Sequence, residues 1–138
     1  MRSHRLVLSL GIIACGCVSG CVIRGADDTM LALYNENRSE FDSLAQQAFA
    51  DPGCISLPAY RKRLKALGIT DARLSTEPHQ QLRLETYREG MVTHGLVRGF
   101  AYSRHELAPL VESLEAVRPP GEGYRRIGEN WYLFVSRD

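Results

Sequence analysis

The chain has 138 residues, of which 44% are hydrophobic and 24% charged. A chain of this length accommodates one domain with a single core of modest size. The 17 basic residues nearly balance the 16 acidic ones, and this balance argues against a nucleic-acid-binding protein.

Residues 1–20 have the layout of a secretory signal peptide. A positively charged start is followed by an uncharged apolar stretch at residues 6–18. Two alternatives stay open. The uncharged run continues to Ile23, which is about long enough for an uncleaved membrane anchor. Ordinary signal cleavage near Gly20 would instead release a soluble protein.

The apolar stretch ends in the tetrapeptide Val18-Ser19-Gly20-Cys21. This tetrapeptide resembles a bacterial lipobox, which consists of an aliphatic residue, two small residues and a cysteine. The resemblance implies that a peptidase cleaves before Cys21, and that Cys21 carries a diacylglycerol and an amino-terminal acyl chain such as palmitate. Two or three acyl chains hold a protein at a membrane without a transmembrane helix.

The resemblance divides the chain into a signal peptide at residues 1–20, a lipidated tether at 21–28 and a single domain at 29–138. The residue after the cysteine is Val22. An aspartate at this position resembles an inner-membrane retention signal of enteric bacteria, so Val22 implies transport to the outer membrane. We therefore expect a lipoprotein of the cell envelope whose domain faces the periplasm.

The first predicted helix covers residues 29–50. Its apolar residues recur with the period of a helix and form one stripe, in which Asn37 occupies the missing position. The stripe consists of Met30, Tyr34, Phe41, Leu44 and Ala48. The sequence Asp51-Pro52-Gly53 ends this helix.

A second helix is predicted over residues 56–68, with Ser56 as its N-cap, Pro58 in its first turn and Gly68 as its C-terminal cap. One face of this helix is basic. It carries Arg61, Lys62, Arg63 and Lys65. This face suits anionic lipid head groups or peptidoglycan carboxylates, or it is an ordinary solvated helix face.

Two strands are predicted after a connection at residues 70–79. Residues 82–87 alternate between apolar and polar side chains, and Glu89-Gly90 turns the chain into a second strand at 91–103. Gly99 lies within this second strand and indicates a bulge, a bend or a close approach by a helix.

A third helix is predicted from Ser103, which forms a capping box with Glu106 and leads into residues 107–114. A later start at Pro109 fits equally well. Residues 118–123 are predicted to form a stiff surface loop.

The last segment is predicted to be a hairpin, with strands at 124–127 and 131–136 joined by a turn at 128–130. The final strand is apolar on both faces, which predicts a central or covered position. Trp131 opens it, and its burial is worth about 5 kcal/mol if it hides about 200 Å².

Together these elements predict an α+β fold. We expect an antiparallel meander sheet of three or four strands with two to three helices packed on one face. The block from Gly99 to Trp131-Tyr132-Leu133-Phe134 resembles a family of small bacterial lipoproteins that end in a tryptophan-tyrosine strand. That resemblance implies no particular activity.

The chain offers no pattern typical of catalysis. His79, His94 and His105 are widely spaced and have no cysteine partner, so no metal site and no cofactor are predicted. Cys54 is predicted to be a small buried hydrophobic residue. The alternatives for its thiol are intermolecular pairing, a reactive role with His94 or His105, and a disulfide with Cys21 if Cys21 carries no lipid.

One group of residues is a candidate interaction surface for a peptide, a glycan or a protein. Arg98, Phe100 and Tyr102 are predicted on one strand face, with Arg125 and Arg126 in a neighbouring strand. The alternative is cross-strand packing, in which the arginine stems cover aromatic rings.

We therefore expect a lipid-anchored, periplasm-facing protein that is not an enzyme and acts as an interaction or structural module. Its expected partners are the membrane, through Cys21, and an envelope protein or peptidoglycan, but not nucleic acid. A small-ligand-binding or glycan-binding lipoprotein is the first alternative, and a hydrolase is the second.

Overall fold

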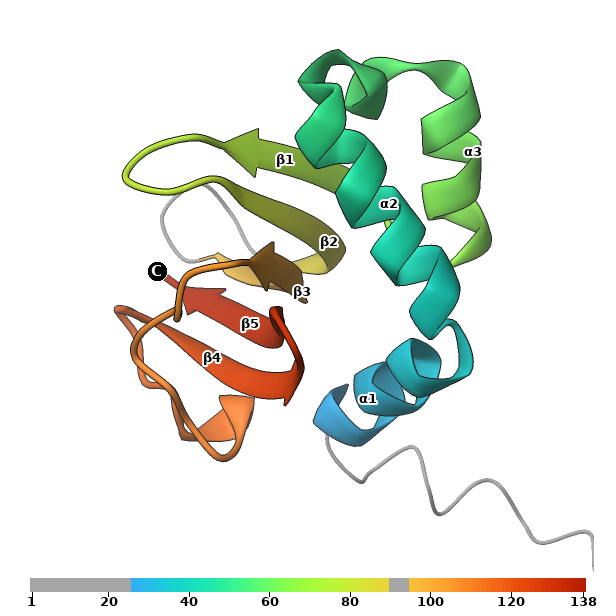
Figure 1. Ribbon diagram of the computed structural model, residues 1–138. Helices are drawn as coiled ribbons and strands as arrows, with labels where there is room; N and C mark the ends of the chain where they lie inside the picture. The colour runs from blue at the N-terminus through green and yellow to red at the C-terminus, as the bar shows by residue number, and fades with distance from the viewer. Residues whose placement is uncertain (1–25, 90–94) are drawn as a thin grey trace, which may run out of the picture.

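The computed structural model describes residues 26–89 and 95–138, and in this part the chain forms a mixed α+β domain (Figure 1). Three α-helices lie on one face of a five-stranded antiparallel sheet. The signal peptide, Cys21 and most of the predicted tether lie outside the described residues, as does His94.

The predicted helix at 29–50 is two helices, α1 (Ala26–Glu36) and α2 (Arg38–Ala50). The break falls at Asn37, whose side-chain Nδ2 donates to the carbonyl oxygen of Leu33 at 2.9 Å. Such side-chain bonds to the backbone compete with regular helix geometry. The resulting bend lets both helices place their apolar stripes against the sheet (Figure 1).

After a short 3₁₀ helix, η2 (Pro52–Ser56), comes α3 (Pro58–Ala66). Leu57 rather than the predicted Ser56 occupies its N-cap position. The predicted glycine cap is confirmed, because Gly68 has a φ of 75° and its amide donates to the carbonyl of Lys65. The amide of Ile69 donates to the carbonyl of Leu64, which completes a Schellman motif.

The sheet has five strands in the order β1-β2-β3-β5-β4, so the expectation of a three- or four-stranded meander is wrong. The strands are β1 (Asp71–Ser75), β2 (Gln81–Glu89), β3 (Leu96–Ser103), β4 (Gly121–Gly128) and β5 (Trp131–Arg137). β1 occupies most of the predicted connection at 70–79. Its two apolar residues, Ala72 and Leu74, pair with Leu84 and Leu82 of β2, and this short pattern is too weak to be recognised alone.

The final hairpin and the central position of β5 are confirmed, since β5 lies between β3 and β4. The predicted helix after Ser103 is wrong. Instead of capping a helix, the Ser103 hydroxyl donates to the carbonyl of His105 at 2.8 Å and accepts from its amide. The chain then runs along the edge of β4, forms the 3₁₀ turn η3 (Leu114–Ala116) and enters β4 at Gly121, within the predicted loop.

The main core lies between the helices and the sheet. Trp131 is fully buried there, with ring centroids 5.4 Å from Phe41 and 5.0 Å from Tyr102, and its Nε1 donates to Asp42 at 2.8 Å. A second apolar cluster covers the opposite face of the sheet. It consists of Ala101, Tyr124, Tyr132 and Phe134.

Candidate functional site

The structure does not assemble the predicted interaction surface from β3. Phe100 is fully buried in the main core, where its ring centroid lies 4.7 Å from that of Phe41. Tyr102 is half-buried and its ring packs against Phe49, while Arg98 is also half-buried. The alternation that places Phe100 and Tyr102 together also turns them toward the helices, so they cannot form an open surface.

Arg125 and Arg126 are adjacent in β4 and therefore point to opposite faces of the sheet. Arg125 lies on the face covered by the helices, and its Nη1 is 3.4 Å from Oδ2 of Asp27. Arg126 lies on the other face and donates to the hydroxyl of Tyr132 at 2.8 Å. These contacts correspond to the packing alternative that the sequence left open.

Two of the four cations on the basic face of α3 are paired within the domain. Arg61 lies 3.0 Å from Asp71, and Arg63 donates to Glu40 at 2.7 Å and to Gln47 at 2.7 Å. These bonds join α3 to α2 and to β1, which indicates that much of this face is structural.

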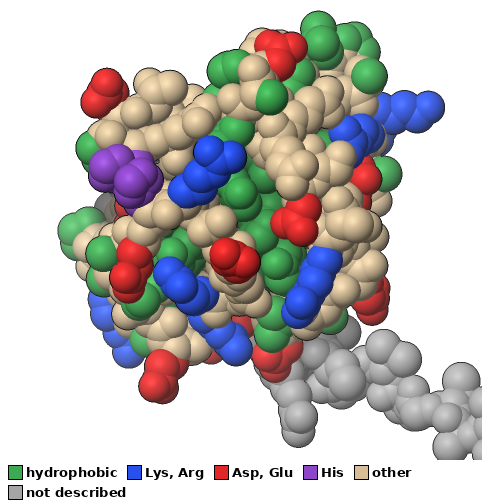
Figure 2. Space-filling view, in the orientation of Figure 1, with side chains coloured by type: hydrophobic (Ala, Val, Ile, Leu, Met, Phe, Trp, Pro, Cys, Tyr) green, Lys and Arg blue, Asp and Glu red, His purple; other side chains and the backbone are tan. Residues whose placement is uncertain are grey.

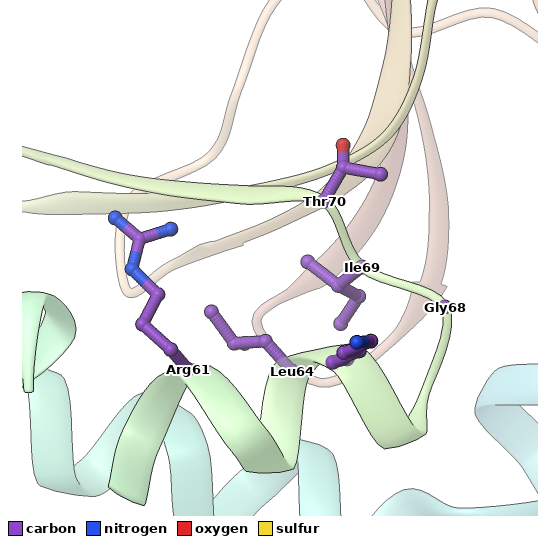
Figure 3. A pocket seen from close by; sticks show the side chains of 6 residues that line it. Arg61, Leu64, Gly68, Ile69 and Thr70 are labelled. Carbon is purple, nitrogen blue, oxygen red and sulfur yellow. The ribbon is translucent and has the colours of Figure 1, made fainter. Parts of the chain in front are cut away.

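A cavity of about 390 Å³ lies where α3 meets the chain leading into β1 (Figure 3). It is lined by Arg61, Leu64, Lys65, Gly68, Ile69 and Thr70. Figure 3 shows the side chains of Leu64 and Ile69 in the space between α3 and the segment that follows Gly68. Arg61 is bound to Asp71, and the Thr70 hydroxyl donates to the carbonyl of Glu85 at 3.1 Å. Most of its polar lining is thus already engaged.

A smaller cavity of about 190 Å³ lies on the sheet face opposite the helices, and we call it the histidine pocket. Its lining residues come from the β1–β2 connection, β2, β3, the segment after β3 and β4. They are Pro78, His79, Gln81, Ser103, His105, Glu106, Leu107, Ala108 and Tyr124. It draws together segments that are far apart in the sequence.

Two histidines form part of this pocket. The imidazoles of His79 and His105 are stacked, with centroids 3.7 Å apart and planes at 16°, and they appear together as the purple patch in Figure 2. The sequence showed no short-range histidine pair. The pairing of β2 with β3 explains their proximity. Gln81 pairs with Ser103, so His79, two residues before Gln81, lies beside His105, two residues after Ser103.

Gln81 lines the pocket beside Tyr124. Its Nε2 atom is buried, and the interaction of its side chain with the Tyr124 hydroxyl acts to lower the pKa of that phenol. Sequence reasoning missed it because a glutamine at the start of a strand carries no signal of its own.

Tyr124 lines the pocket, and Arg83 is bound to its hydroxyl. Arg83 extends from β2 over the ring of Phe134, 5.0 Å from its centroid, and donates to Glu122 and to the Tyr124 hydroxyl. Burial raises the pKa of Tyr124, an effect that Arg83 opposes and Glu122 reinforces. Tyr124 therefore offers a neutral hydroxyl and not a phenolate.

Cys54 is buried, with 1% of its surface exposed, and burial raises the pKa of its thiol. The prediction of a small buried hydrophobic residue is therefore confirmed. Among residues 26–89 and 95–138 there is no group of three or more potential ligands that could hold a metal ion. Within the same residues, no helix has the length and apolar character needed to cross a membrane.

Comparison with protein-family models, with curated proteins and with solved structures found no match for this chain.

Proposed function

We propose that the protein is a lipid-anchored, periplasm-facing protein of the outer membrane that works as a non-enzymatic interaction module. The lipobox-like tetrapeptide ending in Cys21 supports the anchor. The way the domain begins, close behind that cysteine, supports a role at the membrane surface.

The observation that carries this proposal is the shortness of the connection to the domain. α1 begins at Ala26, before the predicted domain start at residue 29. The chain from Cys21 to Ala26 spans at most about 18 Å even when fully extended. A lipid on Cys21 would thus keep the start of α1 close to the bilayer. The domain could then bind only partners that lie near the membrane surface.

Asp27 fixes the start of α1 to the rest of the domain. It is 4% exposed, and its Oδ2 accepts from the amide of Leu114 at 2.9 Å and lies 3.4 Å from Arg125. A carboxylate in the first turn also stabilises α1 through its favourable interaction with the helix dipole. The tether therefore joins a segment that Asp27 holds against η3 and β4, which suits a module that must present one side to its surroundings.

Burial of Cys54 argues against the alternative in which Cys21 carries no lipid and pairs with Cys54. The Cys54 side chain packs in the main core beneath η2, and a disulfide would require it to leave that position.

Mass spectrometry of the protein purified from envelope membranes tests the proposal. The expected product begins at Cys21 and carries the mass of a diacylglycerol and an acyl chain. The Cys21→Ser variant should carry no lipid and leave the outer-membrane fraction. The matched control, Cys54→Ser, should be lipidated like the wild type.

An unlipidated product in the wild type, whether cleaved, uncleaved or disulfide-linked, would contradict the anchor. Crosslinking in intact cells tests the module. A partner recovered with the wild type and lost with Cys21→Ser supports it, whereas recovery of none contradicts it.

Binding of a small ligand is a second candidate function. The histidine pocket favours it, because polar and apolar side chains from segments far apart in the sequence line one cavity there.

A further inference from the structure

One side of α3 is left exposed by the rest of the domain. The buried residues of this helix are Tyr60 and Leu64, and the paired arginines Arg61 and Arg63 lie on either side of them. The residues on the opposite side of the helix are all exposed. They are Pro58, Ala59, Lys62, Lys65 and Ala66, and we call them the outer face of α3.

The outer face carries cations that the fold does not neutralise. Lys62 and Lys65 are the only lysines of the chain, and both lie on this face. Among the residues that the structure describes, neither lysine is in an ion pair, in contrast to Arg61 and Arg63. α3 itself contains no acidic residue. Charge complementarity therefore favours an anionic partner for the outer face.

Exposed apolar side chains adjoin these lysines. Leu57 comes directly before α3 and is 52% exposed, and Pro52 of η2 is exposed as well. Figure 2 shows hydrophobic side chains next to cationic ones at the upper right, where η2 and α3 lie in Figure 1. A leucine exposed beside lysines is typical of surfaces that lie at the head-group level of a bilayer.

Peptidoglycan fits this combination less well than a membrane does. Its carboxylates would bind Lys62 and Lys65, but a polar polymer offers no apolar layer that would remove Leu57 from water. A bilayer with anionic head groups provides both negative charge and an apolar layer just beneath it.

We propose that the outer face of α3, with Leu57 at its end, lies on a bilayer that contains anionic phospholipids. Lys62 and Lys65 bind the phosphate groups, with their aliphatic stems along the interface, and Leu57 enters the boundary of the acyl chains. Two lysines and one leucine bind a membrane weakly by themselves. This inference therefore rests on the proposed lipid anchor, which would hold the domain at the membrane surface.

The test uses the full-length protein, purified from envelope membranes and mixed with vesicles. One kind of vesicle is phosphatidylcholine alone, and the other is equal parts of phosphatidylcholine and phosphatidylglycerol. Flotation reports attachment. Acetylation of Lys62 and Lys65 by an N-hydroxysuccinimide ester, followed by mass spectrometry, reports whether the outer face is covered. In attached protein, acetylation should be at least about threefold slower on the anionic vesicles, and high salt should remove the difference.

The chain offers a matched pair of variants. Leu57 and Leu110 are the two exposed large hydrophobic side chains of the described residues, at 52% and 46%. Leu57→Ser should lose the protection of the lysines on anionic vesicles, whereas Leu110→Ser should keep it. Both variants should melt like the wild type, because each changes an exposed side chain. A negative surface potential without contact would slow acetylation equally in both variants, so the comparison isolates contact.

Equal acetylation of attached protein on the two kinds of vesicle would overturn the proposal and leave the anchor intact. Equal protection in the two leucine variants would overturn it as well. Flotation with the anionic vesicles alone would contradict the anchor and support the surface, and flotation with neither would contradict both. Protection of the lysines by purified peptidoglycan, without protection by anionic vesicles, would assign the outer face to the cell wall and overturn the proposal.

Discussion

Replacing Gly99 by alanine should destabilise the protein far more than a single methyl group usually does. Gly99 lies within β3 opposite Glu85 of β2. An added Cβ would lie 2.0 Å from the carbonyl oxygen of Leu84 and 2.8 Å from Cε1 of Phe134. The oxygen belongs to the backbone of the neighbouring strand, so a change of side-chain rotamer cannot relieve the clash.

Two other glycines provide a scale for this cost. At Gly53 a Cβ would find its nearest neighbour, Oδ1 of Asp51, at 3.5 Å, so Gly53→Ala should gain about 0.4–1 kcal/mol through the unfolded state. At Gly68 there is open space but a φ of 75°, so a left-handed penalty of about 1–2 kcal/mol should outweigh that gain. Gly99→Ala adds overpacking against backbone, and we expect a loss of about 3 kcal/mol or more.

Urea denaturation followed by far-UV circular dichroism measures all three variants on one scale. The expected order of stability is Gly53→Ala, then wild type, then Gly68→Ala, then Gly99→Ala. A Gly99→Ala variant within about 1 kcal/mol of the wild type would refute the packing of β3 against β2 and Phe134 described above.

Three further predictions concern single side chains. Trp131→Phe should lower the free energy of unfolding by about 2 kcal/mol, because apolar area and the hydrogen bond to Asp42 are lost. Urea denaturation is followed by far-UV circular dichroism, since the variant removes the one tryptophan of the chain. An unchanged urea midpoint would contradict this prediction. The Cys54 thiol, buried and with a raised pKa, should react with iodoacetamide only as the protein unfolds, and mass spectrometry showing modification within minutes in native buffer would contradict this. For Asp71, burial acts to raise the pKa but hydrogen bonds, chiefly from Arg61, lower it below the ordinary value. Asp71→Asn should therefore cost under about 1 kcal/mol at pH 7, and urea titrations should find this difference vanishing as the pH falls through the folded-state pKa; a difference that grows in acid would contradict the ion pair.

Where the sequence carried a strong periodic or steric signal, the fold followed it. The apolar alternation on both faces of β5 predicted its central position, and Gly68 predicted the cap of α3. Gly99 indicated a bulge, a bend or the close approach of a helix, and the structure shows instead a close approach by the backbone of the neighbouring strand β2. In these cases local preference and tertiary packing favour the same conformation.

Other elements depend on partners distant in sequence. β1 is a strand because β2 lies beside it, and its five residues show little alternation of their own. Ser103 has the spacing of a capping box, but its hydroxyl is taken by the backbone of His105. Asn37 looked like one polar substitution within a stripe, and it marks the break between α1 and α2.

The candidate site could not be predicted from the sequence for the same reason. The pocket is made by the register of β2 against β3, which sets His79 beside His105 and leaves the amide of Gln81 buried. The arginine and aromatic residues of β3 and β4 were predicted to form an interaction surface, yet Phe100 belongs to the core. The residue types that stand out in a sequence are here the ones that hold the sheet together.

The start of α1 and the histidine pocket lie at different places on the domain. The start of α1 lies at the bottom of Figure 1, and Asp27 ties it to η3 and β4. In the same orientation, the histidine patch lies at the upper left of Figure 2, on the sheet face that the helices leave open. If Cys21 is lipidated as proposed, the start of α1 stays within about 18 Å of the bilayer. This limit applies to the start of α1 alone, and it does not by itself set how the histidine pocket is oriented relative to the bilayer.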